Sequence, residues 1–196
     1  MIPVKAAGGT VAGIIGARTR DLIILEREMA EVADIRVVMT DDGSHGRKGL
    51  VTDALLLLLE QGCEFDEVVA VGPLPMMRAV CEVTRPLGLK TIVSLNPIMV
   101  DGTGMCGGCR VKVGDQVKFA CVDGPDFDGH LVDFDDLMSR LKRYTKDEKV
   151  AHERWSESCR MTKQVGPSAL DAVARGRAPQ SELIELPDPF EDAPGG

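Results

Sequence analysis

The sequence predicts an α/β protein built on a parallel sheet with crossover helices. Between residues 10 and 95, short runs rich in β-branched residues alternate with amphipathic stretches of about a dozen residues. Hydrophobic residues make up 44% of the 196-residue chain, which is enough to bury a core. The longest apolar run, residues 54–59, is far shorter than the roughly 20 residues that span a bilayer, so no membrane role is expected.

The first half of the chain contains four strand candidates and three helix candidates. The strands are predicted at residues 10–16, 35–39, 67–71 and 91–95. The helices are predicted between them, at residues 21–32, 50–61 and 75–87. The first helix is predicted from apolar residues at spacings of 3, 4 and 3, which place them on one helical face: Leu22, Leu25, Met29 and Val32.

The pattern changes after residue 95. Residues 96–130 are rich in Gly, Asp and Cys, and two alternating runs, 110–113 and 116–120, meet at a Gly-Asp turn, which predicts a small β-hairpin. Helical periodicity returns from residue 132 to about 159, and the last 16 residues carry five acids and no base. We therefore expect four parts: a partial nucleotide-binding domain (1–95), a cluster-binding domain (96–131), a helical extension (132–180) and a mobile acidic tail (181–196).

Charge and cysteine usage narrow the functional classes. The net charge of −8 gives no general attraction for phosphate backbones, which argues against nucleic-acid binding. The start of the chain has no basic segment followed by an apolar one, so we expect a cytoplasmic protein. Without a secretion signal, six cysteines point to metal or redox chemistry rather than to a disulfide framework.

Three of these cysteines are crowded together. Asp101, Cys106, Cys109 and Cys121 follow the spacing D-x4-C-x2-C-x11-C. Plant-type 2Fe–2S loops use C-x4-C-x2-C and a distant fourth cysteine, so Asp101 stands where the first cysteine would be. The glycines at 102, 104, 107 and 108 suit a chain that folds tightly around a cluster, and the predicted hairpin returns Cys121 to the other ligands.

Other interpretations of this stretch remain open. A structural zinc site with a Cys3Asp ligand set is chemically possible, and Cys106 with Cys109 would also suit a thiol redox pair. Asp101 taken alone is typical of a turn residue. Cys63 and Cys81 lie among apolar neighbours on or beside helices, so we expect buried, inert thiols there, and Cys159 has no evident partner.

Several motifs, in order, carry a resemblance to a known family. They are the runs 15–21, 40–49, 71–77, 96–111 and 119–130. Together they resemble the small, flavin-containing subunit of NADH-dependent reduced ferredoxin:NADP oxidoreductases, also called sulfide dehydrogenases. These are relatives of the electron-transfer subunit of dihydroorotate dehydrogenase. The resemblance covers about residues 5–145.

This resemblance implies an oxidoreductase subunit of the ferredoxin:NAD(P) type. NADH or NADPH delivers a hydride to FAD, and electrons leave singly through a 2Fe–2S cluster to a larger flavin or iron–sulfur subunit, with ferredoxin as donor or acceptor. The family's cluster ligands fall here on Asp101, Cys106, Cys109 and Cys121. The dihydroorotate relatives use four cysteines, so Asp101 favours the ferredoxin:NADP branch.

The nucleotide-binding candidates lie where strands end. Gly72, Pro73 and Met76 mark a strand-to-helix turn, and ligands of open α/β sheets gather at such carboxyl ends. Arg18 follows another predicted strand. The next loop carries the remaining candidates for contacts to a ribose or phosphate: Asp42, Gly43, Arg47 and Lys48.

The sequence departs from the family at its N-terminus. The FAD-binding β-barrel, the first nucleotide-domain strand and its Gly-rich turn are not found, and residues 1–7 resemble the end of the helix that follows that strand. In the strand order 3-2-1-4-5, this leaves a gap between two parallel strands. Three explanations are a late start codon, a split or truncated gene, and a strand supplied by a partner; a late start or a fragment is preferred over an evolved stand-alone design. FAD binding by this chain alone is thus in doubt, and NAD(H) binding should be weakened.

Two functions are alternatives to the oxidoreductase subunit: a non-catalytic electron-transfer or assembly module, and a zinc-stabilised interaction domain.

Overall fold

The computed structural model describes residues 2–158. Residues 1–150 form one compact unit and residues 151–196 a second, of which the described part, 151–158, is the end of a helix. The predicted acidic tail (181–196), the end of the predicted helical extension and Cys159 lie outside the described residues. No helix within the described range is long and apolar enough to cross a membrane.

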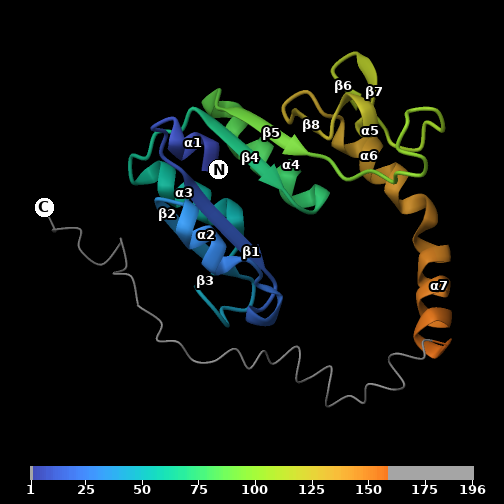
Figure 1. The fold of residues 1–196 in the computed structure, drawn as a ribbon, viewed down its shortest axis with the longest axis horizontal. Coiled ribbons are helices and arrows are strands. Elements are labelled where there is room, and N and C mark those ends of the chain that lie inside the picture. Colours follow the sequence, from blue (N-terminus) through green and yellow to red (C-terminus); the bar gives the residue numbers. More distant parts are fainter. Residues whose placement is uncertain (1, 159–196) are drawn as a thin grey trace, which may run out of the picture. The chain divides into compact units, whose positions relative to one another are not determined.

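Two small sheets carry the first half of the chain (Figure 1). In one, β1 (Ala12–Ala17) pairs in parallel with β2 (Ile35–Thr40), and β2 pairs with the short β3 (Arg47–Lys48). In the other, β4 (Glu67–Val71) pairs in parallel with β5 (Lys90–Ser94), and β8 (Asp126–Asp128) adds an antiparallel strand to β5. The predicted α/β class with parallel strands is confirmed.

A gap separates the two sheets. The strand orders are β3-β2-β1 and β4-β5-β8, and no described strand lies between β1 and β4. This is the arrangement expected when the central strand of the order 3-2-1-4-5 is missing. A cleft of about 580 Å³ is lined by residues of both strands, and Val69 and Val71 of β4 are 61% and 68% exposed. Such exposure is unusual for a parallel strand, which is normally covered on both faces.

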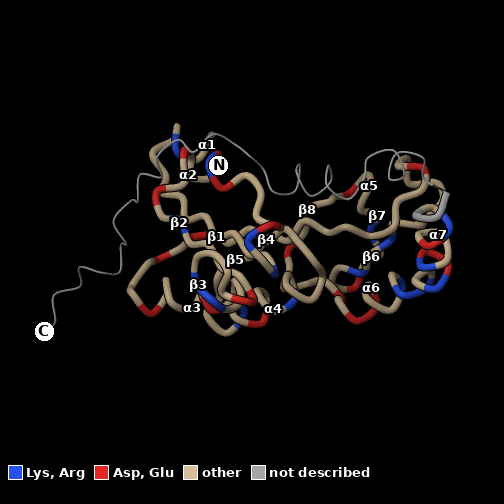
Figure 2. Tube along the Cα trace, turned by 90° about the horizontal axis from the view of Figure 1, so that it is seen from below, with Lys and Arg blue, Asp and Glu red and all other residues tan. Residues whose placement is uncertain are grey.

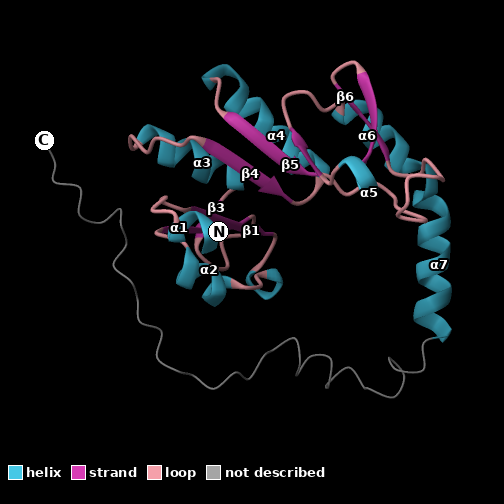
Figure 3. Ribbon diagram, turned by 45° about the horizontal axis from the view of Figure 1, so that its top comes forward, coloured by secondary structure: helices cyan, strands magenta, loops and turns pink. Residues whose placement is uncertain are grey.

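Helices hold the two sheets in one unit. α3 (Val51–Glu60) packs against β1, β2 and α4, while α4 (Leu74–Thr84) packs against β4, β5 and α6. Figure 3 shows α3 and α4 beside the strands that they cover. The other helices of the first half are shorter: α1 (Ile2–Ala6) and α2 (Glu26–Val32).

Two predicted helices differ from the observed ones. Residues 21–32 are not one helix: a 3-10 turn, η1 (Arg20–Leu22), comes first, Leu25 has a left-handed backbone (φ 57°), and α2 begins only at Glu26. Leu22 and Leu25 are exposed, so no packing holds the predicted stripe together there. The helix predicted at 75–87 ends at Thr84, and η2 (Arg85–Leu87) follows because Pro86 has no N–H to continue the helix.

The second half of the unit is built on a hairpin. β6 (Arg110–Val113) and β7 (Gln116–Phe119) pair antiparallel, as predicted. α5 (Ala120–Asp123) follows, then β8, and the helical end consists of α6 (Phe134–Leu141), η3 (Lys142–Tyr144) and α7 (Thr145–Ser158). Val111, Ala120 and Leu137 are buried in the same core as Met77 and Val80 of α4.

A buried polar network fixes the segment that follows β8. The Thr84 hydroxyl at the end of α4 lies 2.9 Å from His130 Nε2 and accepts a 2.7 Å hydrogen bond from the Thr91 hydroxyl. Thr84 and Thr91 are completely buried. His130 is therefore a hydrogen-bonding residue that ties the cluster-side segment to the sheet.

Replacing Thr84 by valine keeps the shape of this site but removes the hydroxyl. We expect the free energy of unfolding to fall by about 1–2 kcal/mol, because His130 loses its buried partner. Urea unfolding measures this change in the free energy of unfolding. The control is Thr10→Val, the same substitution at an exposed threonine. Equal midpoints for Thr84→Val and the wild type would contradict this role.

Candidate metal centre

The β6–β7 hairpin brings two cysteines together. Cys109 precedes β6 and Cys121 follows β7, and the Ala120 N–H donates to the Cys109 carbonyl at 3.2 Å. Their sulfur atoms lie 3.1 Å apart. Cys109 is buried and Cys121 is half-buried, so this pair sits at the edge of the core. The fold thus places a residue from each end of the hairpin at one point, as the spacing predicted.

The preceding loop carries Asp101 and Cys106. The Asp101 carboxylate accepts hydrogen bonds from the Thr103 N–H at 2.9 Å and the Cys106 N–H at 2.8 Å. The Gly108 N–H donates to Cys106 Sγ at 3.4 Å. Gly102, Gly104 and Gly107 have φ between 65° and 84°, a backbone conformation that favours glycine, so the loop needs glycine at these three positions.

The charges of these groups follow from their contacts. The Thr103 N–H, and then the Cys106 N–H, lower the pKa of the Asp101 carboxyl, so it stays ionised as a ligand requires. Contact with the Cys109 thiol, and then burial, raises the pKa of Cys121. Cys121 therefore keeps its proton at neutral pH, and a metal must displace that proton on binding.

Of the four predicted ligands, the side chains of Cys109 and Cys121 are in contact, whereas those of Asp101 and Cys106 do not join them in one metal-binding group. Within residues 2–158, no three His, Cys, Asp or Glu side chains are gathered closely enough to hold a metal ion. The residues nevertheless fit an iron–sulfur cluster in type: three thiols, one ionised carboxylate and a backbone N–H directed at a sulfur. The loop 101–106, in which Cys106 is exposed, has to close on the Cys109–Cys121 pair for all four to reach one cluster.

The nucleotide candidates divide into two groups. Arg18, Gly72, Pro73 and Met76 line the cleft between β1 and β4. Gly72 follows β4, and Pro73 caps the N-terminus of α4, so a helix N-terminus opens into this cleft. This arrangement suits an anionic group such as a phosphate.

The other four candidates do not line the cleft. Asp42, Gly43, Arg47 and Lys48 form the loop that follows β2 and returns to it through β3. The Ser44 hydroxyl and N–H donate to Asp42 and lower the pKa of its carboxyl. This loop still adjoins Arg18, since the Asp42 N–H donates to the Arg18 carbonyl at 3.3 Å.

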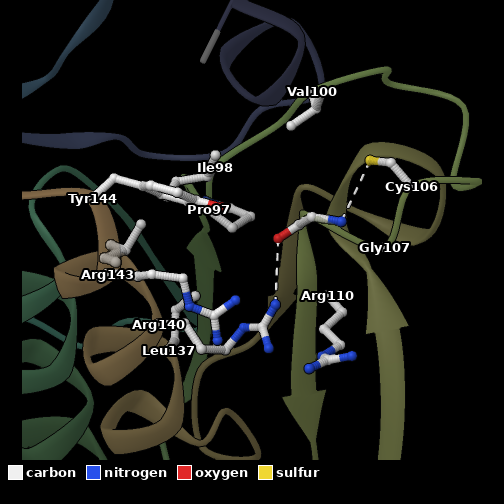
Figure 4. A pocket seen from close by; sticks show the side chains of 12 residues that line it. Pro97, Ile98, Val100, Cys106, Gly107, Arg110, Leu137, Arg140, Arg143 and Tyr144 are labelled. Carbon is white, nitrogen blue, oxygen red and sulfur yellow. Dashed lines mark hydrogen bonds between the residues drawn. The ribbon is translucent and has the colours of Figure 1, made fainter. Parts of the chain in front are cut away.

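A second hollow beside the cysteines was not predicted from the sequence. A pocket of about 360 Å³ lies between the Cys106–Gly108 loop and the α6–η3 segment, and three arginines line it: Arg110, Arg140 and Arg143 (Figure 4). The only sequence signal for it is the spacing of three residues between the last two. Nothing in the pattern indicates that this helix meets the cysteine loop.

Comparisons with known proteins decide between the open interpretations. Residues 96–133 match the iron–sulfur cluster binding domain of dihydroorotate dehydrogenase B. The match includes all four predicted ligands and favours an iron–sulfur cluster over a zinc site or a thiol pair.

Relatives extend the similarity to the first half of the chain. The chain is 51% identical over 151 residues to a Thermotoga maritima protein named dihydroorotate dehydrogenase B (NAD(+)), electron transfer subunit homolog, covering 77% of this chain and 53% of that protein. It is 32% identical over 143 residues to a probable subunit of the same name from Methanocaldococcus jannaschii, covering 73% and 54%. The chain thus spans about half the length of these relatives.

A solved structure shares the fold. It is a structure of the NADH-dependent reduced ferredoxin-NADP oxidoreductase, studied for insights into flavin-based electron bifurcation. One of its chains is 49% identical to this one, with a TM-score of 0.69, and the match covers 78% of this chain and 54% of that chain. The resemblance and the ferredoxin-reductase-like fold inferred from the sequence are confirmed.

Cys81 lies away from this centre and is expected to be inert. It is buried, and burial raises its pKa from 9.0 to about 11. At pH 8 the reactive thiolate is then roughly a hundredfold scarcer than at the ordinary pKa. In the metal-free protein, we expect iodoacetamide to modify Cys81 at least about a hundredfold more slowly than in urea, with exposed Cys106 as the reference. Peptide mass spectrometry measures the rate of Cys81 modification. Equal rates in the folded and the unfolded protein would contradict this expectation.

The ligand role of Asp101 is tested by Asp101→Cys. A thiolate is a softer donor than a carboxylate, so we expect a changed visible spectrum and a changed midpoint potential in the reconstituted protein. Asp115→Cys places a thiol in the exposed hairpin turn of the same region and serves as the matched control. An Asp101→Cys protein with the wild-type spectrum and potential would rule out Asp101 as a ligand.

Proposed function

We propose that this chain is an electron-transfer subunit of a ferredoxin:NAD(P) oxidoreductase. Its 2Fe–2S cluster would be held by Asp101, Cys106, Cys109 and Cys121. NADH or NADPH, FAD and a larger iron–sulfur or flavin subunit would be the redox partners, with ferredoxin as donor or acceptor. The α/β fold and the iron–sulfur domain support this function, and so do relatives named as electron-transfer subunits.

One observation carries the proposal. The hairpin places the Cys109 and Cys121 sulfurs 3.1 Å apart within residues that match an iron–sulfur domain. When bound, a 2Fe–2S cluster supplies a site that takes up and releases single electrons. The chain's own residues supply the ligands, and the Gly108 N–H supplies a hydrogen bond to Cys106 Sγ.

The nucleotide would bind at the other part of the unit, away from the cysteines. Gly72, Pro73 and Met76 would meet its phosphate, ribose or nicotinamide at the start of α4, and Arg18 would contact the adenosine part. Asp42, Gly43, Arg47 and Lys48 would contribute from the loop beside Arg18. Consistent with this division, we propose residues 1–95 as the nucleotide-binding part and 96–131 as the cluster domain, followed by helices at 132–180.

The proposal is tested by electron exchange with a ferredoxin. The anaerobically reconstituted full chain is reduced with dithionite, freed of reductant and mixed with oxidised ferredoxin in a stopped-flow instrument. We expect the cluster to be reoxidised while ferredoxin is reduced. The number of electrons that ferredoxin gains should equal the number that the cluster loses. A Cys109→Ser protein, which lacks one ligand, should give no such exchange. A wild-type cluster that exchanges no electrons with ferredoxin would count against this function.

A further inference from the structure

Arg140 links α6 to the loop that carries the first cysteines. Its Nη2 donates to the Gly108 carbonyl at 3.5 Å (Figure 4). The N–H of the same glycine donates to Cys106 Sγ at 3.4 Å. Gly108 thus accepts a hydrogen bond from α6 and donates one to the most exposed of the three predicted cysteine ligands.

The packing of α6 places Arg140 beside this loop. Leu137, three residues earlier, is 1% exposed, and Leu141 packs against the same core. Both leucines line the pocket together with Arg140. Residues three apart lie on one face of a helix, so the burial of Leu137 directs Arg140 toward the loop instead of into open solvent. Arg140 is itself half-buried.

The charged side chains that line this pocket are all positive. Arg110 of the hairpin and Arg143 of η3 line it with Arg140, and no Asp or Glu among the described residues does. The next helix, α7, carries acidic and basic residues side by side (Figure 2), but its acids Asp147 and Glu148 do not line the pocket. Within the described part of the chain, none of the three arginines forms an ion pair. Their charges are therefore not neutralised by a nearby carboxylate.

Positive charge beside a cysteine ligand favours electron uptake. A cluster held by three thiolates and a carboxylate is anionic, and it becomes more negative when it gains an electron. A guanidinium stays charged at every physiological pH and stabilises the more negative state. Arg140 should act more strongly than Arg110 or Arg143, because those two are exposed and water screens their charges.

We infer that Arg140 is a positioning residue for the cluster centre and raises its midpoint potential. Its hydrogen bond holds Gly108 so that the Gly108 N–H is directed at Cys106 Sγ, and its charge favours the reduced centre. One electron from an external donor reduces one ferric ion to ferrous iron, while Arg140 keeps its proton throughout. The inference rests on the proposed function, because it requires a redox-active centre on these ligands.

The midpoint potential of the anaerobically reconstituted full chain tests this role. We expect Arg140→Gln to lower the equilibrium constant for one-electron reduction about threefold or more, which is a shift of about 28 mV to lower potential. Arg143→Gln, at an exposed arginine of the same pocket, should shift the potential less. Arg27→Gln on α2 removes the same charge from an exposed position outside this pocket and should leave the potential unchanged.

Arg140→Lys separates the charge from the hydrogen bond. Lysine keeps the positive charge but lacks the planar fork of donors, so its potential should lie between those of the wild type and Arg140→Gln. A potential equal to that of the wild type would overturn the positioning by hydrogen bonding. A potential equal to that of Arg140→Gln would overturn the effect of charge.

Iron content, EPR and urea unfolding distinguish a changed potential from a lost cluster or a weakened fold. A lower potential for Arg140→Gln, with iron content and stability retained, supports the inference. An Arg140→Gln protein that has the wild-type potential, or that only loses iron or stability, would overturn it and leave the proposed function standing. A potential that depends on Arg140, in a wild-type chain that exchanges no electrons with ferredoxin, would support the inference and count against the proposed function. A full chain that takes up no iron would reject both.

Discussion

The packing of the β6–β7 hairpin against α6 and α4 determines where the chemistry of this chain is placed. Val111 and Leu137 are almost completely buried, in a core shared with Met77 of α4. Because this core fixes both ends of the hairpin, it places the Cys109 and Cys121 sulfurs 3.1 Å apart. A cluster loop without such an anchor would have to order all of its ligands at the moment of binding, at a large entropic cost.

Helix α4 links the two proposed functional parts of the unit. Its N-terminus opens into the cleft where Gly72, Pro73 and Met76 lie, and its C-terminal residue Thr84 hydrogen-bonds to His130 beyond β8. The same helix packs on β4, β5 and α6. The proposed nucleotide side and the proposed cluster side therefore share one element, although the cleft between β1 and β4 leaves the first sheet held chiefly through α3.

The sequence predicted the elements well because their signals are local. The strands at 35–39 and 67–71 follow from short runs of β-branched residues, and the hairpin at 110–120 follows from two alternating runs that meet at a Gly-Asp turn; the structure contains all of them. The helix at 21–32 was wrong because its apolar stripe, including Leu22 and Leu25, is not buried, which periodicity alone does not reveal. The arginine pocket was missed for a related reason: Arg143 and Cys106 are far apart in sequence, and only tertiary packing brings them together.

The most direct test of the account is the metal content of the full chain purified without oxygen. Iron and acid-labile sulfide near two per chain, with a rhombic S = 1/2 EPR signal after dithionite reduction, are the expected result for a 2Fe–2S centre on Asp101 and the three cysteines. A colourless protein with about one zinc per chain and no such signal would contradict the central claim, because it would make this region a structural metal site.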